Sequence, residues 1–200
     1  MEMQSEIAMS FSARHVILDR DGVLNVERSD GGYIEDWSQW RWTPGALEGL
    51  GMLGAAGVHL SIATNQAGVG RGLISRETLD AIHRHMLDEA AQAGAVIQQV
   101  FVCPHAPEDG CACRKPAPGL LLSAINAAGI PANATIVVGD DLRDLEAARA
   151  ACVAAVLVRT GKGRLAEAAA ARAGVPVFDD LRAFALAFVA PSRLVFEGTP

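Results

Sequence analysis

Residues 15–25 of this chain read HVILDRDGVLN. The apolar run Val16–Leu18 lies between polar and turn-forming residues, and its length is typical of a buried β-strand rather than a helix. Two acids, Asp19 and Asp21, follow this run, and Gly22 lets the backbone turn sharply after them. Because ligands bind beyond the carboxyl ends of the strands in an open α/β sheet, the stretch predicts a site with two adjacent carboxylates.

The pair Asp19 and Asp21 has two interpretations from the residues alone. One is nucleophilic catalysis through an aspartyl-phosphate, in which one carboxylate attacks and its neighbour exchanges a proton. The other is a calcium-binding turn or two solvated loop acids, because a D-x-D pattern occurs widely. The remainder of the chain has to separate these interpretations.

The composition is that of a globular protein, since half of the 200 residues are hydrophobic and a fifth are charged. This length suits a single domain over residues 1–200, with a core at about 14–190 and a tail at each end. A net charge of −6 without a run of Lys or Arg argues against binding nucleic acid or an anionic membrane, but not against small anionic substrates. No stretch approaches the roughly 20 apolar residues of a membrane span, and the N-terminus lacks a signal-peptide pattern. We therefore expect a cytoplasmic protein that is stable as a monomer.

Beyond the first strand, predicted helices and strands alternate. The expected strands cover residues 58–63, 96–102, 134–138, 154–158 and 175–178. The expected helices cover about 44–56, 76–93 and 118–129, a segment ending near 173, and 181–189. Thr43 and Ser75 are expected to cap the first two of these helices. The alternation predicts a doubly wound, mostly parallel α/β sheet.

The second strand is expected to end at Thr64, Asn65 and Gln66, followed by the glycine-rich segment 67–72. Small polar side chains, exposed backbone amides and a nearby arginine suit a phosphate, and the alternative is an ordinary flexible loop. Four of the ten aromatic residues lie in the loop 26–42, which is expected to cover the site, to pack on the domain edge, or to do both.

Two histidines, His83 and His85, are two residues apart on the second expected helix. Residues at this spacing lie on different faces of a helix, so the pair is not expected to act together. We expect both side chains to be solvated.

The loop after the third strand contains four residues with metal-ligand chemistry, Cys103, His105, Cys111 and Cys113. Four thiol and imidazole ligands complete a tetrahedral zinc site without a position for water, so the ion is expected to be structural. The alternative is a set of unliganded cysteines.

Cations and acids follow the next two strand ends. Arg114 and Lys115 come directly after the last cysteine, so a zinc-stiffened loop would fix where two phosphate-binding cations point. Asp140, Asp141 and Asp144 follow the fourth strand, where carboxylates suit Mg²⁺ and also suit capping of the next helix.

The ordered set of DxD, a strand-end Thr, a Lys and GDxxxD resembles the haloacid dehalogenase-like phosphatases over residues 15–164. Within that superfamily, LDRDGVLN, TNQAGVGRG, CPH, CACRKPAPG, VGDDLRDLEAA and LVRTGKG are similar to motifs of the D-glycero-D-manno-heptose 1,7-bisphosphate phosphatases. The related histidinol-phosphate phosphatases share the DxDG, TNQ and zinc-loop elements, whereas Asn25, Arg71 and the final basic loop favour the heptose family. Val23 replaces a common Thr, and Asp141 stands where Ser or Lys is expected.

The resemblance implies a Rossmann-like fold without a large cap domain, and hydrolysis of the sugar 7-phosphate through an aspartyl-phosphate. It implies that Asp19 is the nucleophile and that Asp21 is the general acid and base. Thr64 and Lys115 would hold the phosphoryl oxygens. The implied substrate-binding residues are Asn25, Arg28, Tyr33, Asn65, Gln66, Arg71 and Arg114.

The resemblance also implies a catalytic Mg²⁺ and a structural Zn²⁺. Mg²⁺ would be held by Asp19, the main-chain carbonyl of Asp21 and Asp140, with Asp144 supporting this shell from behind. The alternatives are a histidinol-phosphate phosphatase, which needs the same core, and a catalytically idle zinc-containing scaffold. A DNA 3′-phosphatase is disfavoured by the acidic net charge.

Overall fold

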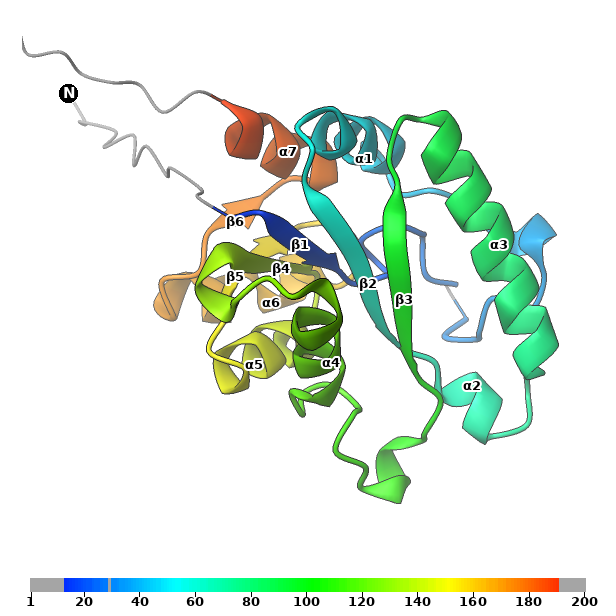
Figure 1. Ribbon diagram of the computed structural model, residues 1–200. Helices are drawn as coiled ribbons and strands as arrows, with labels where there is room; N and C mark the ends of the chain where they lie inside the picture. The colour runs from blue at the N-terminus through cyan, green and yellow to red at the C-terminus, as the bar shows by residue number, and fades with distance from the viewer. Residues whose placement is uncertain (1–12, 29, 191–200) are drawn as a thin grey trace, which may run out of the picture.

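The computed structural model describes residues 13–28 and 30–190, built around a six-stranded parallel sheet (Figure 1). The strands are β1 (His15–Leu18), β2 (His59–Asn65), β3 (Ile97–Cys103), β4 (Thr135–Gly139), β5 (Ala154–Val158) and β6 (Val177–Phe178). Their order is β3-β2-β1-β4-β5-β6, and each neighbouring pair is parallel. The chain therefore winds outward in both directions from β1 and β4, and the point where it reverses lies at the centre of the sheet.

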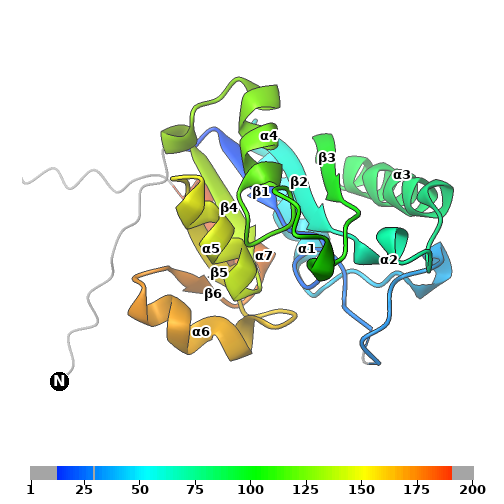
Figure 2. The ribbon, with the colours of Figure 1, turned by 90° about the horizontal axis from the view of Figure 1, so that it is seen from below.

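Helices cover both faces of this sheet, as Figures 1 and 2 show. They are α1 (Ala46–Ala55), α2 (Ala67–Gly70), α3 (Arg76–Gln92), α4 (Gly119–Ala128), α5 (Leu142–Ala150), α6 (Gly163–Arg172) and α7 (Leu181–Val189). Short 3-10 helices occur at η1 (Trp37–Gln39), η2 (Pro107–Asp109) and η3 (Ala132–Ala134). The prediction of a doubly wound parallel sheet is confirmed.

Alternate residues of β1 explain the two layers of helices. Val16 and Leu18 pack in the core that includes α1, α3 and α7, whereas Ile17 packs on the opposite face with α4 and α5. Successive side chains of a strand point to opposite faces, so a strand covered on both sides must be apolar throughout. This is why the short run before Asp19 is uninterrupted.

The connection from β1 to α1 combines the two roles expected of the loop 26–42. Trp40 is buried, and Trp37 and Trp42 pack against the core that α3 contributes to, while Tyr33 lines the cavity described below. Within the described part of this connection the helical structure is the single turn η1, which agrees with a fold that lacks a large cap domain.

Two local expectations, for Thr43 and for His83, were wrong. Thr43 does not cap α1, because its hydroxyl donates to the carbonyl of Val23, and the helix begins two residues after Pro44 with Gly45 as its N-cap. In the glycine-rich segment 67–72, where no helix was predicted, residues 67–70 form the helix α2. His83 is not solvated but 6 % exposed, on the face of α3 that packs on the sheet, whereas His85 is exposed and stacks on Trp37.

The expected C-terminal tail falls on residues 191–200, outside the described residues. In the described part of the chain, every helix is too short or too polar to cross a membrane.

Candidate active site

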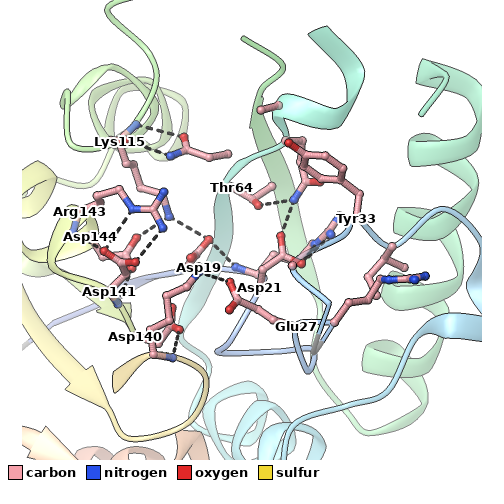
Figure 3. Close-up of a pocket in the computed structure, with 18 of the residues that line it drawn as sticks. Asp19, Asp21, Glu27, Tyr33, Thr64, Lys115, Asp140, Asp141, Arg143 and Asp144 are labelled. Atoms are coloured by element: carbon pink, nitrogen blue, oxygen red, sulfur yellow. Dashed lines mark hydrogen bonds and ion pairs between the residues drawn. The ribbon is translucent and has the colours of Figure 1, made fainter. Parts of the chain in front are cut away.

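The carboxyl ends of three neighbouring strands deliver polar side chains to one cavity of about 350 Å³ (Figure 3). Asp19 and Asp21 follow β1, Thr64 lies in β2, and Asp140 follows β4. The loop after β3 adds Lys115. The strand register forces this meeting, since β1 pairs with β2 on one side and β4 on the other.

Lys115 is the central cation of the cavity, although its side chain is only 3 % exposed. Its ammonium nitrogen lies 2.8 Å from Asp19 Oδ1 and 2.5 Å from Asp144 Oδ1. The Asn65 amide fixes the lysine backbone, since its Nδ2 donates to the Lys115 carbonyl and its Oδ1 accepts from the Lys115 amide. Burial favours a neutral amine, but Asp144 and Asp19 outweigh burial and raise the pKa of Lys115.

Asp19 and Asp140 lie in surroundings that hold too few cations for the carboxylates present. Burial, Asp144 and Asp21 raise the pKa of Asp19 to about 7 despite the opposing effect of Lys115. Burial, Asp19 and Asp144 likewise raise the pKa of Asp140 to about 8. Carboxylate oxygens of Asp19, Asp140 and Asp144 all lie within 4.8 Å of one another, a donor set that suits a hard divalent cation.

Two glycines make room for Asp140. A Cβ on either Gly22 or Gly161 would lie 2.1 Å from Asp140 Oδ2, and both have positive φ angles, 90° and 54°. The same Asp140 oxygen accepts the main-chain N–H of Lys162 at 2.8 Å. The backbone thus closes tightly around this carboxylate, which neither glycine could do with a side chain.

Of the three acids after β4, Asp141 and Asp144 form the N-terminal cap of α5. Asp141 caps α5, since its side chain accepts the Arg143 N–H at 3.0 Å and Asp144 accepts the Asp141 N–H at 3.1 Å in return. Asp141 also forms an ion pair with the Arg143 guanidinium at 2.7 Å. Asp140, Asp141 and Asp144 all line the cavity, and Asp140 is the one of these three that lies outside the capping box.

Asp21 differs from Asp19 in its side-chain partners, which are a guanidinium and two amides instead of the shared lysine. Its Oδ1 accepts from Arg20 Nη2 at 2.7 Å and Asn25 Nδ2 at 3.0 Å, and its Oδ2 accepts from Gln66 Nε2 at 2.6 Å. Burial raises the pKa of Asp21, but the Arg20 guanidinium and these amides outweigh burial and lower it. Gln66 Nε2 also donates to Thr64 Oγ1 at 2.8 Å, which joins the two strand ends.

The other residues expected at the substrate are spread over the rim and its surroundings. Arg28, Tyr33 and Arg114 line the cavity, and Arg28 is paired with Asp30. Arg71 lies outside the lining and donates to the Tyr33 hydroxyl at 3.2 Å. The rim therefore carries guanidinium groups at the entrance.

The side-chain amides of Asn25 and Asn65 bind other groups of the protein. Asn25 is fully buried and lies behind Asp21, outside the cavity lining. Asn65 lines the cavity, but both polar atoms of its amide bind the backbone of Lys115. Both amides hold catalytic candidates in place.

The four ligand candidates of the cysteine loop gather at one point. Cys113 Sγ lies 3.2 Å from Cys103 Sγ, 3.4 Å from Cys111 Sγ and 3.3 Å from His105 Nδ1. Tetrahedral zinc with bonds of about 2.3 Å to sulfur separates its ligand atoms by about 3.7 Å. The donor set and its spacing fit Zn²⁺.

Comparisons with known proteins agree with this geometry. The HAD-hydrolase-like family model matches residues 112–184. A D-glycero-beta-D-manno-heptose-1,7-bisphosphate 7-phosphatase of Pseudomonas aeruginosa is 40% identical over 174 residues, which cover 87% of this chain and 97% of that protein. The chain belongs to the heptose-1,7-bisphosphate 7-phosphatase family.

Members of this family with either anomeric name are similar to the chain. A D-glycero-alpha-D-manno-heptose-1,7-bisphosphate 7-phosphatase of Mycobacterium tuberculosis is 38% identical, over 86% of this chain and 90% of its own length. The crystal structure of the D,D-heptose 1,7-bisphosphate phosphatase of Bordetella bronchiseptica, complexed with magnesium and phosphate, superimposes with a TM-score of 0.81. It is 41% identical and covers 86% of this chain and 96% of that one.

Several polar residues near the family's DxD motif were missed by sequence reasoning. Arg20 stands between the two motif acids, yet its buried side chain and its contact with His83 were not expected. Lys162 Nζ lies 2.6 Å from Glu27 Oε1, and both residues line the cavity. Arg20 could have been found from its place inside the motif. The pair of Lys162 and Glu27 could not be found from a local pattern, because the two residues are 135 positions apart in the sequence.

Proposed function

We propose that this chain hydrolyses the 7-phosphate of D-glycero-D-manno-heptose 1,7-bisphosphate through an aspartyl-phosphate. The observation that carries the proposal is the pair of unequal aspartates, one beside a shared lysine and one beside its own arginine, in a cavity with guanidinium groups at its rim. The names of the relatives support the heptose substrate and do not favour histidinol phosphate. A scaffold role is disfavoured because every expected catalytic position is filled.

In the first step, a carboxylate oxygen of Asp19 attacks phosphorus, and the bond from phosphorus to the sugar oxygen breaks. Asp21 gives its proton to that oxygen, so the sugar leaves as a neutral alcohol. Lys115 and Thr64 hold the phosphoryl oxygens while the charge moves. The products of this step are the dephosphorylated sugar position and phosphorylated Asp19.

In the second step, Asp21, now a carboxylate, takes a proton from water. The resulting hydroxide attacks phosphorus of the aspartyl-phosphate, the acyl oxygen leaves, and inorganic phosphate and the Asp19 carboxylate are released. Asp21 ends the cycle protonated, as the next turnover requires. The two aspartates have different cation partners, Lys115 for Asp19 and Arg20 for Asp21, and this difference in position supports assigning them different tasks.

Asp19, the main-chain carbonyl of Asp21 and Asp140 would hold Mg²⁺, and Asp144 lies close enough to support them through Lys115. When bound, the ion supplies positive charge that offsets carboxylate repulsion and the charge of the transferring phosphoryl group. The raised pKa values of Asp19 and Asp140 support this assignment, since both groups need a cation to stay ionised near neutral pH.

Cys103, His105, Cys111 and Cys113 would hold a structural Zn²⁺. Arg114 and Lys115 follow directly, so the closed loop would set where their side chains begin. The Arg114 guanidinium donates to the His105 carbonyl at 3.1 Å, which ties the rim to the zinc loop.

The sugar and its distal phosphate would be recognised at the rim, by Arg28, Tyr33 and Arg114, with Arg71 acting through Tyr33. Gln66, Asn25 and Asn65 would contribute mainly by holding Asp21 and Lys115. We place the enzyme in the cytoplasm, as a monomeric single domain without nucleic-acid or membrane partners, in the synthesis of nucleotide-activated heptose for lipopolysaccharide or a related glycan.

The test is kcat/KM for phosphate release, with Mg²⁺, from both heptose 1,7-bisphosphate anomers and from histidinol phosphate. We expect the heptose anomers to be hydrolysed faster, and the preferred anomer names the sugar pathway. Faster turnover of histidinol phosphate would overturn the proposed substrate while leaving the mechanism in place. A folded, zinc-loaded protein that releases phosphate from none of the three would support the scaffold alternative.

A further inference from the structure

Arg20 occupies an unusual place for a cation, since its side chain is only 1% exposed. Its main-chain N–H donates to Asp19 Oδ1 at 2.7 Å, and its side chain turns the other way, to Asp21. A buried guanidinium is costly unless every face has a partner. The partners of the Arg20 side chain therefore indicate its role in the site.

The guanidinium is held on three sides. Nη2 and Nε donate to Asp21 Oδ1 at 2.7 and 3.3 Å, and Nη1 lies 3.2 Å from His83 Nε2. The carbon of the guanidinium lies 5.7 Å from the centre of the Trp40 ring. Burial, assisted by the arginine charge, lowers the pKa of His83 to about 3, so this imidazole stays neutral and offers Nε2 as an acceptor. The helix α3 thereby supports Arg20 from behind.

The two oxygens of Asp21 are consequently unequal. Oδ1 accepts three N–H groups, two from the guanidinium and one from Asn25. Oδ2 accepts one hydrogen bond, from the neutral amide of Gln66, which also donates to Thr64. Oδ1 is therefore held by two N–H groups of a cation and one amide, whereas Oδ2 is held by a single amide, so Oδ2 is the oxygen that can change partners at lower cost.

We propose that Arg20, supported by His83 and Trp40, is a positioning residue that fixes Asp21 Oδ1 and leaves Oδ2 as the oxygen that exchanges protons with the leaving group and with water. This inference rests on the proposed aspartyl-phosphate mechanism. Asp21 Oδ2–H gives its proton to the sugar oxygen as the P–O bond breaks, and Oδ2 later accepts one proton from the attacking water. Without Arg20 the carboxyl group can rotate, and the proton is held in the productive direction for only part of the time.

The test compares leaving groups that differ in their need for a proton. 4-Nitrophenolate leaves without protonation, whereas phenolate, with a pKa of about 10, and a sugar alkoxide need it increasingly. Because kcat/KM ends at formation of the phosphoenzyme, it reports the step in which Asp21 acts as an acid. We expect Arg20→Met to lower kcat/KM for the heptose bisphosphate about 10²-fold more than for 4-nitrophenyl phosphate, with phenyl phosphate between them.

A second pair of variants keeps the test independent of whether Arg20→Met folds. His83→Leu removes the acceptor on Nη1 and is expected to change the same ratio in the same direction by about 10-fold, while His83→Gln, which restores an acceptor, returns it toward wild type. Arg76→Met removes an exposed arginine of the same helix, paired with Asp80, and leaves the ratio unchanged.

Equal loss on all three substrates, in Arg20→Met and in His83→Leu, would show a merely structural role and overturn the inference. The wild-type rates are read separately. If the wild type hydrolyses the aryl phosphates but not the heptose bisphosphate, the proposed substrate fails, and the ratio between phenyl and 4-nitrophenyl phosphate still decides the role of Arg20.

Discussion

Asp19 and Asp21 are two residues apart, and each contacts a buried cation, yet their protonation is driven in opposite directions. Lys115 is shared between Asp19 and Asp144, and Asp140 adds a third carboxylate, so the pKa of Asp19 rises to about 7. Arg20 and two amides serve Asp21, and its pKa falls. Burial is the largest effect on both groups and raises both pKa values, so the number of carboxylates per cation decides that the pKa of Asp19 ends above its ordinary value and that of Asp21 below it.

The largest effect is expected on the Asp19 side. Asp19→Asn removes the nucleophile and should lower kcat by at least about 10⁴-fold on every substrate, whatever the leaving group. The free energy of unfolding should not fall, since a buried carboxylate is removed while Lys115 keeps Asp144. Phosphate-release assays and urea unfolding measure both quantities, and persistent activity in a pure preparation would contradict a covalent mechanism.

The second largest effect is expected when Lys115, the cation that Asp19 and Asp144 share, is replaced. Lys115→Met leaves Asp19 and Asp144 without their common partner, so we expect a loss of about 3–5 kcal/mol in stability and of about 10²–10³-fold in kcat. Adding Asp144→Asn should recover part of the stability, because it removes one of the two uncompensated carboxylates. Denaturant unfolding of the single and double variants tests this coupling, and simple additivity of the two substitutions would contradict the shared-cation description.

The Asp19–Lys115 pair and the Asp21–Arg20 pair should also differ in their dependence on zinc. Lys115 is delivered by the cysteine loop, whereas Arg20 comes from the same turn as Asp21. Cys113→Ser should lower zinc affinity by at least about 100-fold and slow turnover about 10-fold through Lys115, without changing the leaving-group ratio that reports on Arg20. Cys152→Ser, which replaces an exposed cysteine outside the loop, is the matched control and should retain zinc and activity. Metal analysis and kinetics of the two variants measure the difference.

The smallest effect concerns His83 behind Arg20. Its pKa is about 3 in the folded protein and 6.5 as a free side chain, so the unfolded chain binds more protons between these values. The free energy of unfolding of the wild type relative to His83→Gln should be constant above about pH 7 and fall as the pH drops below about 6.5. The raised pKa values of Asp19 and Asp140 act with the opposite sign but cancel in this difference. Urea unfolding at several pH values measures it, and a difference independent of pH would contradict a buried neutral imidazole.

Much of the fold could be predicted because its strands are short apolar runs, each followed by polar or turn-forming residues. The fifth strand and the last helix were predicted at their observed bounds, and the others within a few residues. Thr43 misled because a hydroxyl before a proline resembles a helix cap, while tertiary contact diverted it to Val23. Local patterns compete with such long-range partners, and the sequence alone does not rank them.

Within the site, residue type revealed the carboxylates, the lysine and the four metal-ligand candidates, because their chemistry is tied to strand ends and close spacing. Residue type misled for charged or ionisable groups that are buried. The spacing of His83 and His85 correctly placed them on different faces, but which face turns inward depends on how α3 packs. Arg20 was overlooked for the same reason, since arginine is ordinarily exposed.

The sequence by itself determined the order of the strands and helices, the chemistry at each strand end and the membership of a phosphatase family, because these depend on local pattern and residue type. Only the tertiary structure decided which acids share a cation, which oxygen of Asp21 is held, and that Asn25 and Asn65 support catalytic candidates from behind. The reason is physical. Electrostatic interactions depend on distance and burial, and both are properties of the folded chain.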